Sequence, residues 1–230
     1  MSTRAVIVLQ ARVSSTRLPA KALATIAGTT LLERSLRRLM RSGVGAVLLA
    51  TTERPEDDAL VQIAAGTQVP VFRGSTDDVL GRYLAAAESA AADVVIRATG
   101  DNPAVDVDAP SRVLRAIERS SADYACEDGL PTGAGVEAIT YEALCRAAAA
   151  ASTSEDREHV TLYVKRRPGA FRIARQPAPA ALRRPDLRFT VDTRDDLEYM
   201  RRVFAHAAVP EPSLPQLIVA ARVCRRSDAA

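Results

Sequence analysis

Residues 5–21 read AVIVLQARVSSTRLPAK, an apolar run followed directly by a basic, hydroxyl-rich segment. The apolar, β-branched residues 5–9 are typical of a buried strand. The segment after them holds three cations and three hydroxyl groups: Arg12, Ser14, Ser15, Thr16, Arg17 and Lys21. Open α/β sheets bind ligands at the carboxyl ends of their strands, and backbone N–H groups beside fixed cations suit an oligoanion. The stretch therefore predicts a phosphate site with a nucleoside triphosphate as ligand, although a solvated basic loop would have a similar composition.

Predicted strands and helices alternate after this stretch. A capping box over residues 30–33 begins a helix whose apolar residues keep helical spacing up to Gly43. Further strands are expected at residues 46–50, 69–72 and 94–98, with helices at residues 57–66 and from a cap at residues 75–78 through Tyr83. Parallel neighbouring strands need crossover helices, so this alternation predicts a parallel, doubly wound α/β sheet.

The second half of the chain shows a looser alternation. Helices are expected at residues 108–120, 141–151, 155–166, 195–207 and 214–225, and strands around Tyr124 and at residues 171–174 and 188–191. Pro131, Gly133 and Gly135 mark turns between them. At 230 residues the chain is long enough for one sizeable core, so we expect a single domain over residues 1–230.

The composition argues against several classes of protein. The formal net charge is only +3, the arginines are spread along the chain and aromatic residues make up 4%, so no nucleic-acid partner is expected. No apolar run approaches the roughly 20 residues of a membrane span. Residues 1–4 lead into a strand rather than a signal peptide, so we expect a cytoplasmic protein without a membrane partner. Cys126, Cys145 and Cys224 form no C-x-x-C pair, so neither disulfides nor a zinc site is expected.

Two aspartates stand at the ends of apolar predicted strands, Asp101 after VVIRATG and Asp192 after RFTV. If both strands belong to one sheet, both carboxylates reach the same rim as the basic loop. Proteins hold Mg²⁺ beside a triphosphate with one or two carboxylates, while phosphate oxygens and water fill the remaining positions. The pair is therefore a candidate Mg²⁺ site, although either Asp alone would also suit a helix cap or a turn.

The loop sequence QARVSSTRLPAK closely resembles the signature loop of the cytidylyltransferases that make CMP-activated acidic sugars, where the pattern is QAR-x-x-S-T-R-LPGK. Five later segments resemble, in order, those of the spore-coat polysaccharide synthesis (SpsF-like) branch of that family: FRGSTDDVLGRY, RATGDNPAVD, PTGAGVE, DREHVT and RFTVDTRDDL. The matches run from residue 10 to about residue 197. The resemblance implies a three-layer α/β domain of the nucleotide-diphospho-sugar transferase (GT-A-like) type, with a mostly parallel sheet. It also implies that residues 130–151 project and build a homodimer.

The resemblance further implies roles for single residues. Those expected to bind the nucleotide are Ala11, Arg12, Ser15, Arg17 and Lys21 at the triphosphate and Thr51, Arg73 and Asp78 on the nucleoside side. Those expected to hold Mg²⁺ are Asp101 and Asp192. Those in segments expected near the acceptor are Glu137, Arg157 and His159.

The chain departs from the family pattern at two places. Ala20 stands where the family usually has Gly, and an Ala there demands an ordinary negative φ. Residues 133–135 read GAG, where relatives often have a bulkier charged residue and an Asp. The second departure concerns the acceptor rather than the nucleotide.

The expected function is nucleotidyl transfer. An acceptor oxygen of a sugar, sugar acid or similar small molecule attacks the α-phosphorus of CTP and releases pyrophosphate, while Mg²⁺, Arg12, Arg17 and Lys21 neutralise the developing charge. The D-x-D pattern at Asp106 and Asp108 points to a different class, the metal-dependent glycosyltransferases, although Asp108 also suits the N-cap of the next helix. A non-catalytic nucleotide-binding protein is the third possibility.

Overall fold

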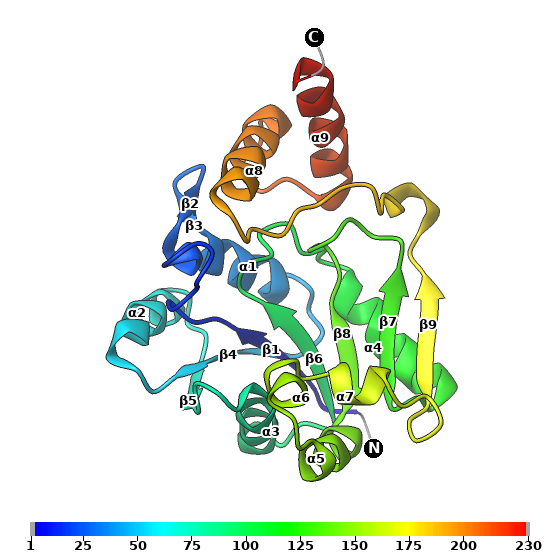
Figure 1. Cartoon of the computed structure of the whole chain (residues 1–230). Coiled ribbons are helices and arrows are strands. Elements are labelled where there is room, and N and C mark those ends of the chain that lie inside the picture. Colours follow the sequence, from blue (N-terminus) through cyan, green and yellow to red (C-terminus); the bar gives the residue numbers. More distant parts are fainter. Residues whose placement is uncertain (1–2, 229–230) are drawn as a thin grey trace.

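The structure, a computed structural model, describes residues 3–228 and is built around a seven-stranded sheet (Figure 1). The strands lie in the order β5 (Val71–Gly74), β4 (Ala46–Thr52), β1 (Ala5–Gln10), β6 (Val94–Thr99), β8 (Glu137–Thr140), β7 (Tyr124–Asp128) and β9 (Ile173–Pro177). β5, β4, β1 and β6 are parallel neighbours, β8 runs antiparallel to β6 and β7, and β9 is parallel to β7. The predicted fold class, a mostly parallel α/β sheet, is confirmed.

Helices cover both faces of the sheet and complete three layers (Figure 1). One face is covered by α1 (Leu31–Met40), α2 (Asp58–Gly66) and α4 (Ala109–Ser120), and the other by α3 (Val79–Ser89), α5 (Tyr141–Ala150), α6 (Ser154–Glu158) and α7 (Leu162–Lys165). α8 (Arg194–Ala207) and α9 (Leu214–Asp228) pack together beside the carboxyl ends of the central strands. Single 3-10 turns lie at Lys21–Leu23, Pro55–Asp57 and Ala180–Leu182, and β2 (Thr25–Ile26) pairs with β3 (Thr29–Thr30).

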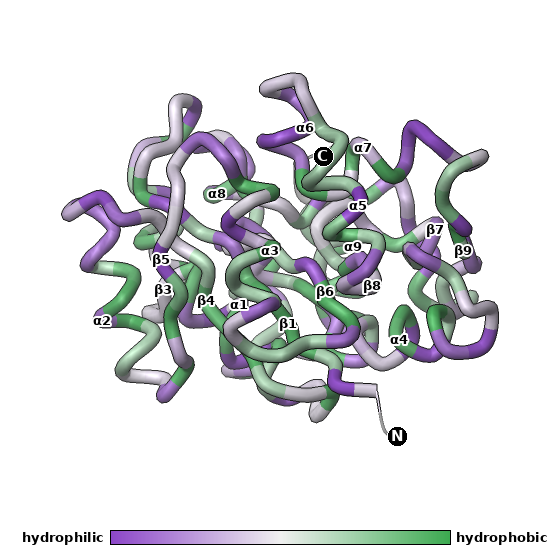
Figure 2. The backbone as a smooth tube through the Cα atoms, turned by 90° about the horizontal axis from the view of Figure 1, so that it is seen from below, coloured by the Kyte–Doolittle hydropathy of each residue, from purple (hydrophilic) through white to green (hydrophobic). Residues whose placement is uncertain are grey.

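The central strands are apolar on both faces because helices cover both. In β1, Ile7 and Leu9 pack on the side of α1, while Val6 and Val8 pack on the side of α3. Burying each such side chain stabilises the fold by about 1.5–3 kcal/mol. Figure 2 shows the same pattern, with hydrophobic positions along the central strands and hydrophilic ones in the outer loops.

Polar side chains fix where several helices begin. The Thr30 hydroxyl accepts a hydrogen bond from the backbone N–H of Glu33 at 3.1 Å, so the predicted start of α1 is confirmed. α3 is capped by Asp78, whose carboxylate accepts from the N–H of Gly81 at 2.8 Å. Ser75 instead accepts from the N–H of Asp78 and stabilises the turn before the helix.

The expectation that residues 130–151 project from the domain is wrong. They include β8, which lies inside the sheet between β6 and β7, and α5, which packs on the sheet. Ala138, Ile139 and Leu144 are completely buried. The turn residues before β8 interrupt the sequence pattern, so this short strand is not recognisable from the sequence. Its pairing partners, β6 and β7, lie elsewhere in the chain.

Two further predictions from the second half of the chain are wrong, and a third holds only in part. Residues 155–166 form two helices rather than one, because the chain turns after His159 and buries Val160 against the sheet. Residues 188–191 are not a strand; they cross the carboxyl ends of the sheet and hydrogen-bond to loops. Asp108 does occupy the N-cap position of α4, as expected, but its side chain makes no capping hydrogen bond.

Candidate active site

The basic loop after β1 is held by backbone hydrogen bonds. The N–H of Ala11 donates to the carbonyl of Ala50 at 3.3 Å, and the N–H of Ala20 donates to the carbonyl of Val13 at 3.0 Å. Ala20 has a φ of 55°, in the left-handed region, which costs an L-residue about 1–2 kcal/mol. The expectation of a negative φ at Ala20 is wrong, because the loop keeps the conformation that a Gly adopts freely.

Asp57 anchors this loop to the end of β4. Its side chain is buried, and its Oδ1 accepts a hydrogen bond from the N–H of Val13 at 2.7 Å. Its Oδ2 accepts from both the backbone N–H and the hydroxyl of Thr52. The sequence indicates Asp57 only as part of a helix start. No local pattern reveals the anchor, because Asp57 and Val13 are 44 positions apart.

Replacing Asp57 by Ala is expected to lower the free energy of unfolding by about 2–3 kcal/mol, because the Val13 N–H and the Thr52 hydroxyl lose a charged acceptor. Affinity for nucleoside triphosphates should fall as well, since the loop loses its anchor. Urea unfolding and nucleotide titration measure the two effects. Asp58→Ala, at the neighbouring exposed Asp, is the control; equal losses in the two variants would contradict the anchoring role.

A cavity of about 310 Å³ lies between this loop and the carboxyl ends of β1 and β6. Its walls include Ala11, Arg12, Ser15, Arg17 and Lys21 from the loop and Arg97, Asp101 and Asp192 from the opposite side. Arg97 is a further residue of this site, and no sequence motif identified it. A charged residue inside the otherwise apolar run VVIRAT was the available signal, since such a charge needs a buried partner or a ligand.

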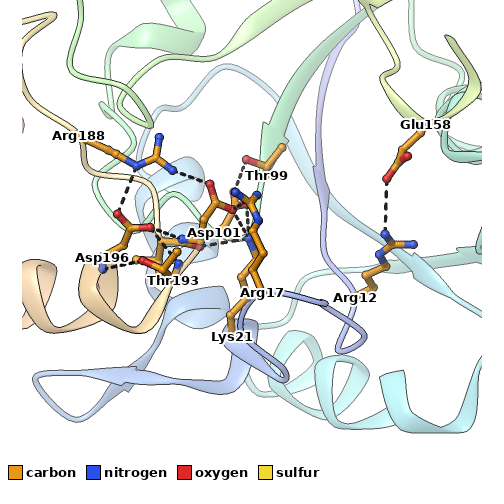
Figure 3. A network of polar contacts seen from close by, with 11 residues as sticks. Arg12, Arg17, Lys21, Thr99, Asp101, Glu158, Arg188, Thr193 and Asp196 are labelled. Atoms are coloured by element: carbon orange, nitrogen blue, oxygen red, sulfur yellow. Dashed lines mark hydrogen bonds and ion pairs between the residues drawn. The ribbon is translucent and has the colours of Figure 1, made fainter. Parts of the chain in front are cut away.

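Two carboxylates meet on one ammonium group at the rim of this cavity (Figure 3). The Nζ of Lys21 donates to Asp101 Oδ2 at 2.7 Å and to Asp192 Oδ1 at 2.9 Å. Asp192 does not reach this position on a sheet strand. The N–H of Val191 instead donates to the carbonyl of Asp101 at 2.9 Å, and this bond joins the two segments directly.

Further donors fix the orientation of both carboxylates. The Thr99 hydroxyl donates to Asp101 Oδ1 at 2.6 Å. Arg17 Nη2 lies 2.9 Å from Asp192 Oδ1, and Arg188 Nη2 donates to Asp192 Oδ2 at 2.6 Å. Burial alone would raise the pKa of Asp192, but Lys21 and these two arginines outweigh it and hold the pKa below its usual value. Asp192 is therefore ionised at neutral pH.

The acidic pair fits a magnesium ion in its chemistry. Two carboxylate oxygens converge on one position, which in this structure is that of the Lys21 ammonium. No group of three or more His, Cys, Asp or Glu side chains within residues 3–228 is arranged to hold a metal ion. An ion at Asp101 and Asp192 would therefore complete its shell with phosphate oxygens and water, as Mg²⁺ commonly does. It would compete with Lys21 for the same oxygens.

The three residues expected on the nucleoside side do not line this cavity. Thr51 is completely buried. Arg73 donates to the carbonyls of Thr52 and Arg54, both at 2.8 Å, and pairs with Asp58 on the outer side of β5. Asp78 caps α3. The contacts of Arg73 and Asp78 support the surrounding loops, whereas the buried hydroxyl of Thr51 has no hydrogen-bond partner within residues 3–228.

The three residues expected near the acceptor lie in different places. Glu137 lines a second cavity of about 310 Å³ beside β7 and β8. Arg157 pairs with Asp78 at 3.2 Å. His159 lines a smaller cavity of about 130 Å³ together with Arg12, which pairs with Glu158 at 3.6 Å (Figure 3). The structure therefore does not bring the three into one pocket.

The D-x-D pattern lies away from the cavity. Asp106 is buried and pairs with Arg112 of α4 at 2.6 Å, and Asp108 is exposed before the same helix. Neither lines the cavity between the loop and β6. The pattern thus stabilises the start of α4 and supplies no metal ligand at the basic loop.

Comparison with known proteins identifies the family of this chain. Residues 5–217 match the sequence profile of the family described as Cytidylyltransferase. The chain belongs to this family. It is 31% identical over 218 residues to the spore coat polysaccharide biosynthesis protein SpsF of Bacillus subtilis (strain 168), with 92% of this chain and 91% of SpsF covered. The resemblance predicted from the loop and the later segments is confirmed.

Solved structures of other cytidylyltransferases share the fold. A cytidylyltransferase from Leptospira borgpetersenii serovar Hardjo-bovis (strain JB197) superposes with a TM-score of 0.89 at 28% identity, covering 99% of this chain and 96% of that one. CMP:2-keto-3-deoxy-manno-octonic acid synthetase complexed with CTP superposes with a TM-score of 0.67 at 18% identity, covering 88% and 99%. The second likeness concerns the fold alone. Among residues 3–228, no helix has the length and apolar character needed to cross a membrane.

Proposed function

We propose that this cytidylyltransferase uses Mg²⁺ to transfer CMP from CTP to an oxygen of a small acceptor, with release of pyrophosphate. The observation that supports this most directly is the meeting of Lys21, Asp101 and Asp192 at the rim of the basic-loop cavity. Cations for phosphates and carboxylates for a divalent ion stand together there, as nucleotidyl transfer requires.

The inner part of the site suits a pyrimidine base. The cavity of about 130 Å³ adjoins the larger one, and Gln10, Arg12 and Arg97 line both. In the part of the chain that the structure describes, the buried Oε1 of Gln10 has no donor and the buried Nε–H of Arg82 has no acceptor. Cytosine offers an amino donor and ring acceptors to such groups. We therefore place the base in the inner compartment and the triphosphate along the loop.

The reaction is an in-line displacement. The acceptor hydroxyl oxygen forms a bond to the α-phosphorus as the bond to the bridging oxygen of pyrophosphate breaks, and the hydroxyl proton passes to solvent. Arg12, Arg17 and Lys21 neutralise charge on the α-phosphate and on the leaving group. Mg²⁺ held by Asp101 and Asp192 would supply further charge neutralisation at the phosphate oxygens.

Pyrophosphate release with a panel of nucleoside triphosphates and acceptors tests this proposal. We expect CTP to be consumed in preference to UTP, ATP and GTP, only with Mg²⁺ and only with one class among sugars, sugar acids and related small molecules. Each triphosphate that binds should also raise the melting temperature by mass action. Turnover of a nucleotide sugar but of no triphosphate would favour a glycosyltransferase, and CTP binding without any turnover would favour a silent binding protein.

A homodimer is proposed as the working form. Residues 137–150 form β8 and α5 within the domain rather than a projecting arm, so the proposed dimer does not depend on such an arm. Light scattering at micromolar concentration measures the mass directly. A monomeric mass would contradict the dimer and leave the proposed chemistry unaffected.

A further inference from the structure

A row of side chains crosses the sheet beside the nucleotide cavity. The strand register places Arg97 of β6 opposite Glu137 of β8, Glu137 opposite Cys126 of β7, and Cys126 opposite Arg175 of β9. Arg97 lines the nucleotide cavity, whereas the other three line the second cavity of about 310 Å³. Glu137 therefore stands between the two cavities.

The carboxylate of Glu137 is saturated by the protein itself. Its Oε2 accepts from Arg97 Nη1 and from the Thr161 hydroxyl, both at 2.9 Å. Its Oε1 accepts from the Tyr124 hydroxyl at 2.6 Å and from Lys165 Nζ at 2.9 Å. An ionised carboxylate has about four acceptor sites, and these donors occupy them. Such contacts suit an anchor for other side chains better than a ligand for the acceptor.

The charge on Glu137 is stable across the physiological range. Burial opposes ionisation, but the charges of Arg97 and Lys165 and the hydrogen bond from Tyr124 lower the pKa of Glu137 to about 2. Burial, together with the neighbouring carboxylate, raises the pKa of Tyr124, so its hydroxyl stays a neutral donor. Two cations thus surround one carboxylate, and the cluster keeps one net positive charge.

Arg97 has donor capacity beyond this pair. Its Nη1 bonds Glu137, but its buried Nε–H has no acceptor within residues 3–228. The side chain lines both the outer and the inner compartment of the nucleotide cavity. A guanidinium whose Nη1 is fixed by a carboxylate presents its remaining N–H groups in a fixed plane, which suits an anionic oxygen.

We propose that Glu137 is a positioning residue that aims the guanidinium of Arg97 at the α-phosphate of the bound nucleotide. This inference rests on the proposed function, in which the base occupies the inner compartment and the triphosphate lies along the loop, with its α-phosphate nearest the base. The ribose and the α-phosphate join the base to the outer phosphates, so they lie where Arg97 lines both compartments. Of these two groups, only the α-phosphate offers anionic oxygens to the guanidinium. Arg97 contacts the substrate, and Glu137 acts only through Arg97.

Calorimetric titration of the whole chain with CMP and with cytidine tests this inference. Arg97→Lys keeps the charge and a pair with Glu137, but a single ammonium cannot also present the guanidinium edge to a phosphate. Its dissociation constant for CMP should rise roughly 10- to 100-fold, as expected for a lost charge-assisted hydrogen bond, while that for cytidine changes by less than about twofold. Glu137→Gln should show the same difference between CMP and cytidine.

A double variant and a control decide between positioning and general damage. Arg97→Lys combined with Glu137→Gln should bind CMP no worse than Arg97→Lys alone, because Glu137 acts through Arg97. Asp128→Asn breaks the exposed pair of Asp128 with Arg175 at the far end of the row and should bind CMP like the wild type. Glu137→Asp keeps the buried charge on a shorter side chain. It replaces Glu137→Gln in these titrations if circular dichroism shows that Glu137→Gln does not fold.

Three results would overturn the inference. The first is an unchanged CMP affinity in Arg97→Lys, and the second is a loss of cytidine affinity equal to the loss of CMP affinity. The third is a double variant whose loss of CMP affinity equals the product of the fold-losses of the two single variants. A rise in the acceptor KM of Glu137→Gln with unchanged CMP affinity would assign Glu137 to the acceptor instead. A wild-type protein that binds neither CMP nor CTP would overturn the proposed function, and this inference with it.

Discussion

Asn in place of Asp101 or Asp192 is expected to lower the rate of pyrophosphate release by about a hundredfold or more, because several kcal/mol of charge stabilisation depend on the bound ion. Asn keeps the size and hydrogen bonding of the side chain but lacks the negative charge that holds Mg²⁺. The rate measured across a Mg²⁺ titration should show weaker dependence on the ion. Circular dichroism and thermal melting should show an intact fold.

The structure separates a metal-binding role of these two aspartates from a helix-capping role more clearly than the sequence does. Neither carboxylate caps a helix, since Thr193 caps α8 and Asp101 accepts from Thr99 and Lys21. Asn also caps as well as Asp does, so a capping role predicts no loss. Asp195→Asn, on the exposed first turn of α8, is the matched control. Wild-type turnover in both site variants would rule out the two-carboxylate metal site.

The parts of the fold that depend on local pattern could be predicted from the sequence. Buried runs such as residues 5–9, each followed by a helix, define the parallel half of the sheet. β8 could not be predicted in its place, because a strand of four residues between turns carries little periodicity. Its pairing with β6 and β7 depends on side chains such as Ala138 and Ile139, which become buried only when all three strands have assembled.

The site could be predicted only in part for a related reason. Arg12, Arg17 and Lys21 lie in one contiguous loop with a recognisable sequence. Arg97 and Asp57 depend instead on contacts across 40 and 44 positions, which no local pattern contains. The segment before Asp192 has the alternation of a strand, but its backbone bonds to loops at the carboxyl ends of the sheet.

Replacing Lys21 by Met is expected to lower turnover by about a hundredfold, because a phosphate-binding cation is lost. The same variant should bind Mg²⁺ more tightly in the absence of nucleotide. The Lys21 ammonium lies 2.7 and 2.9 Å from the carboxylates of Asp101 and Asp192, so it competes with an ion for the same oxygens. Without it the two carboxylates repel each other, and a divalent cation relieves that repulsion.

Thermal melting with and without Mg²⁺ measures this second effect, since an ion that binds only the folded protein raises its melting temperature. Lys21→Met should melt below the wild type without Mg²⁺ and respond more strongly to it. Arg166→Met removes a cation from an exposed pair with Glu155 and should respond like the wild type. If Mg²⁺ does not change the melting temperature of Lys21→Met, then Asp101 and Asp192 do not hold the ion, because no ammonium remains to compete with it.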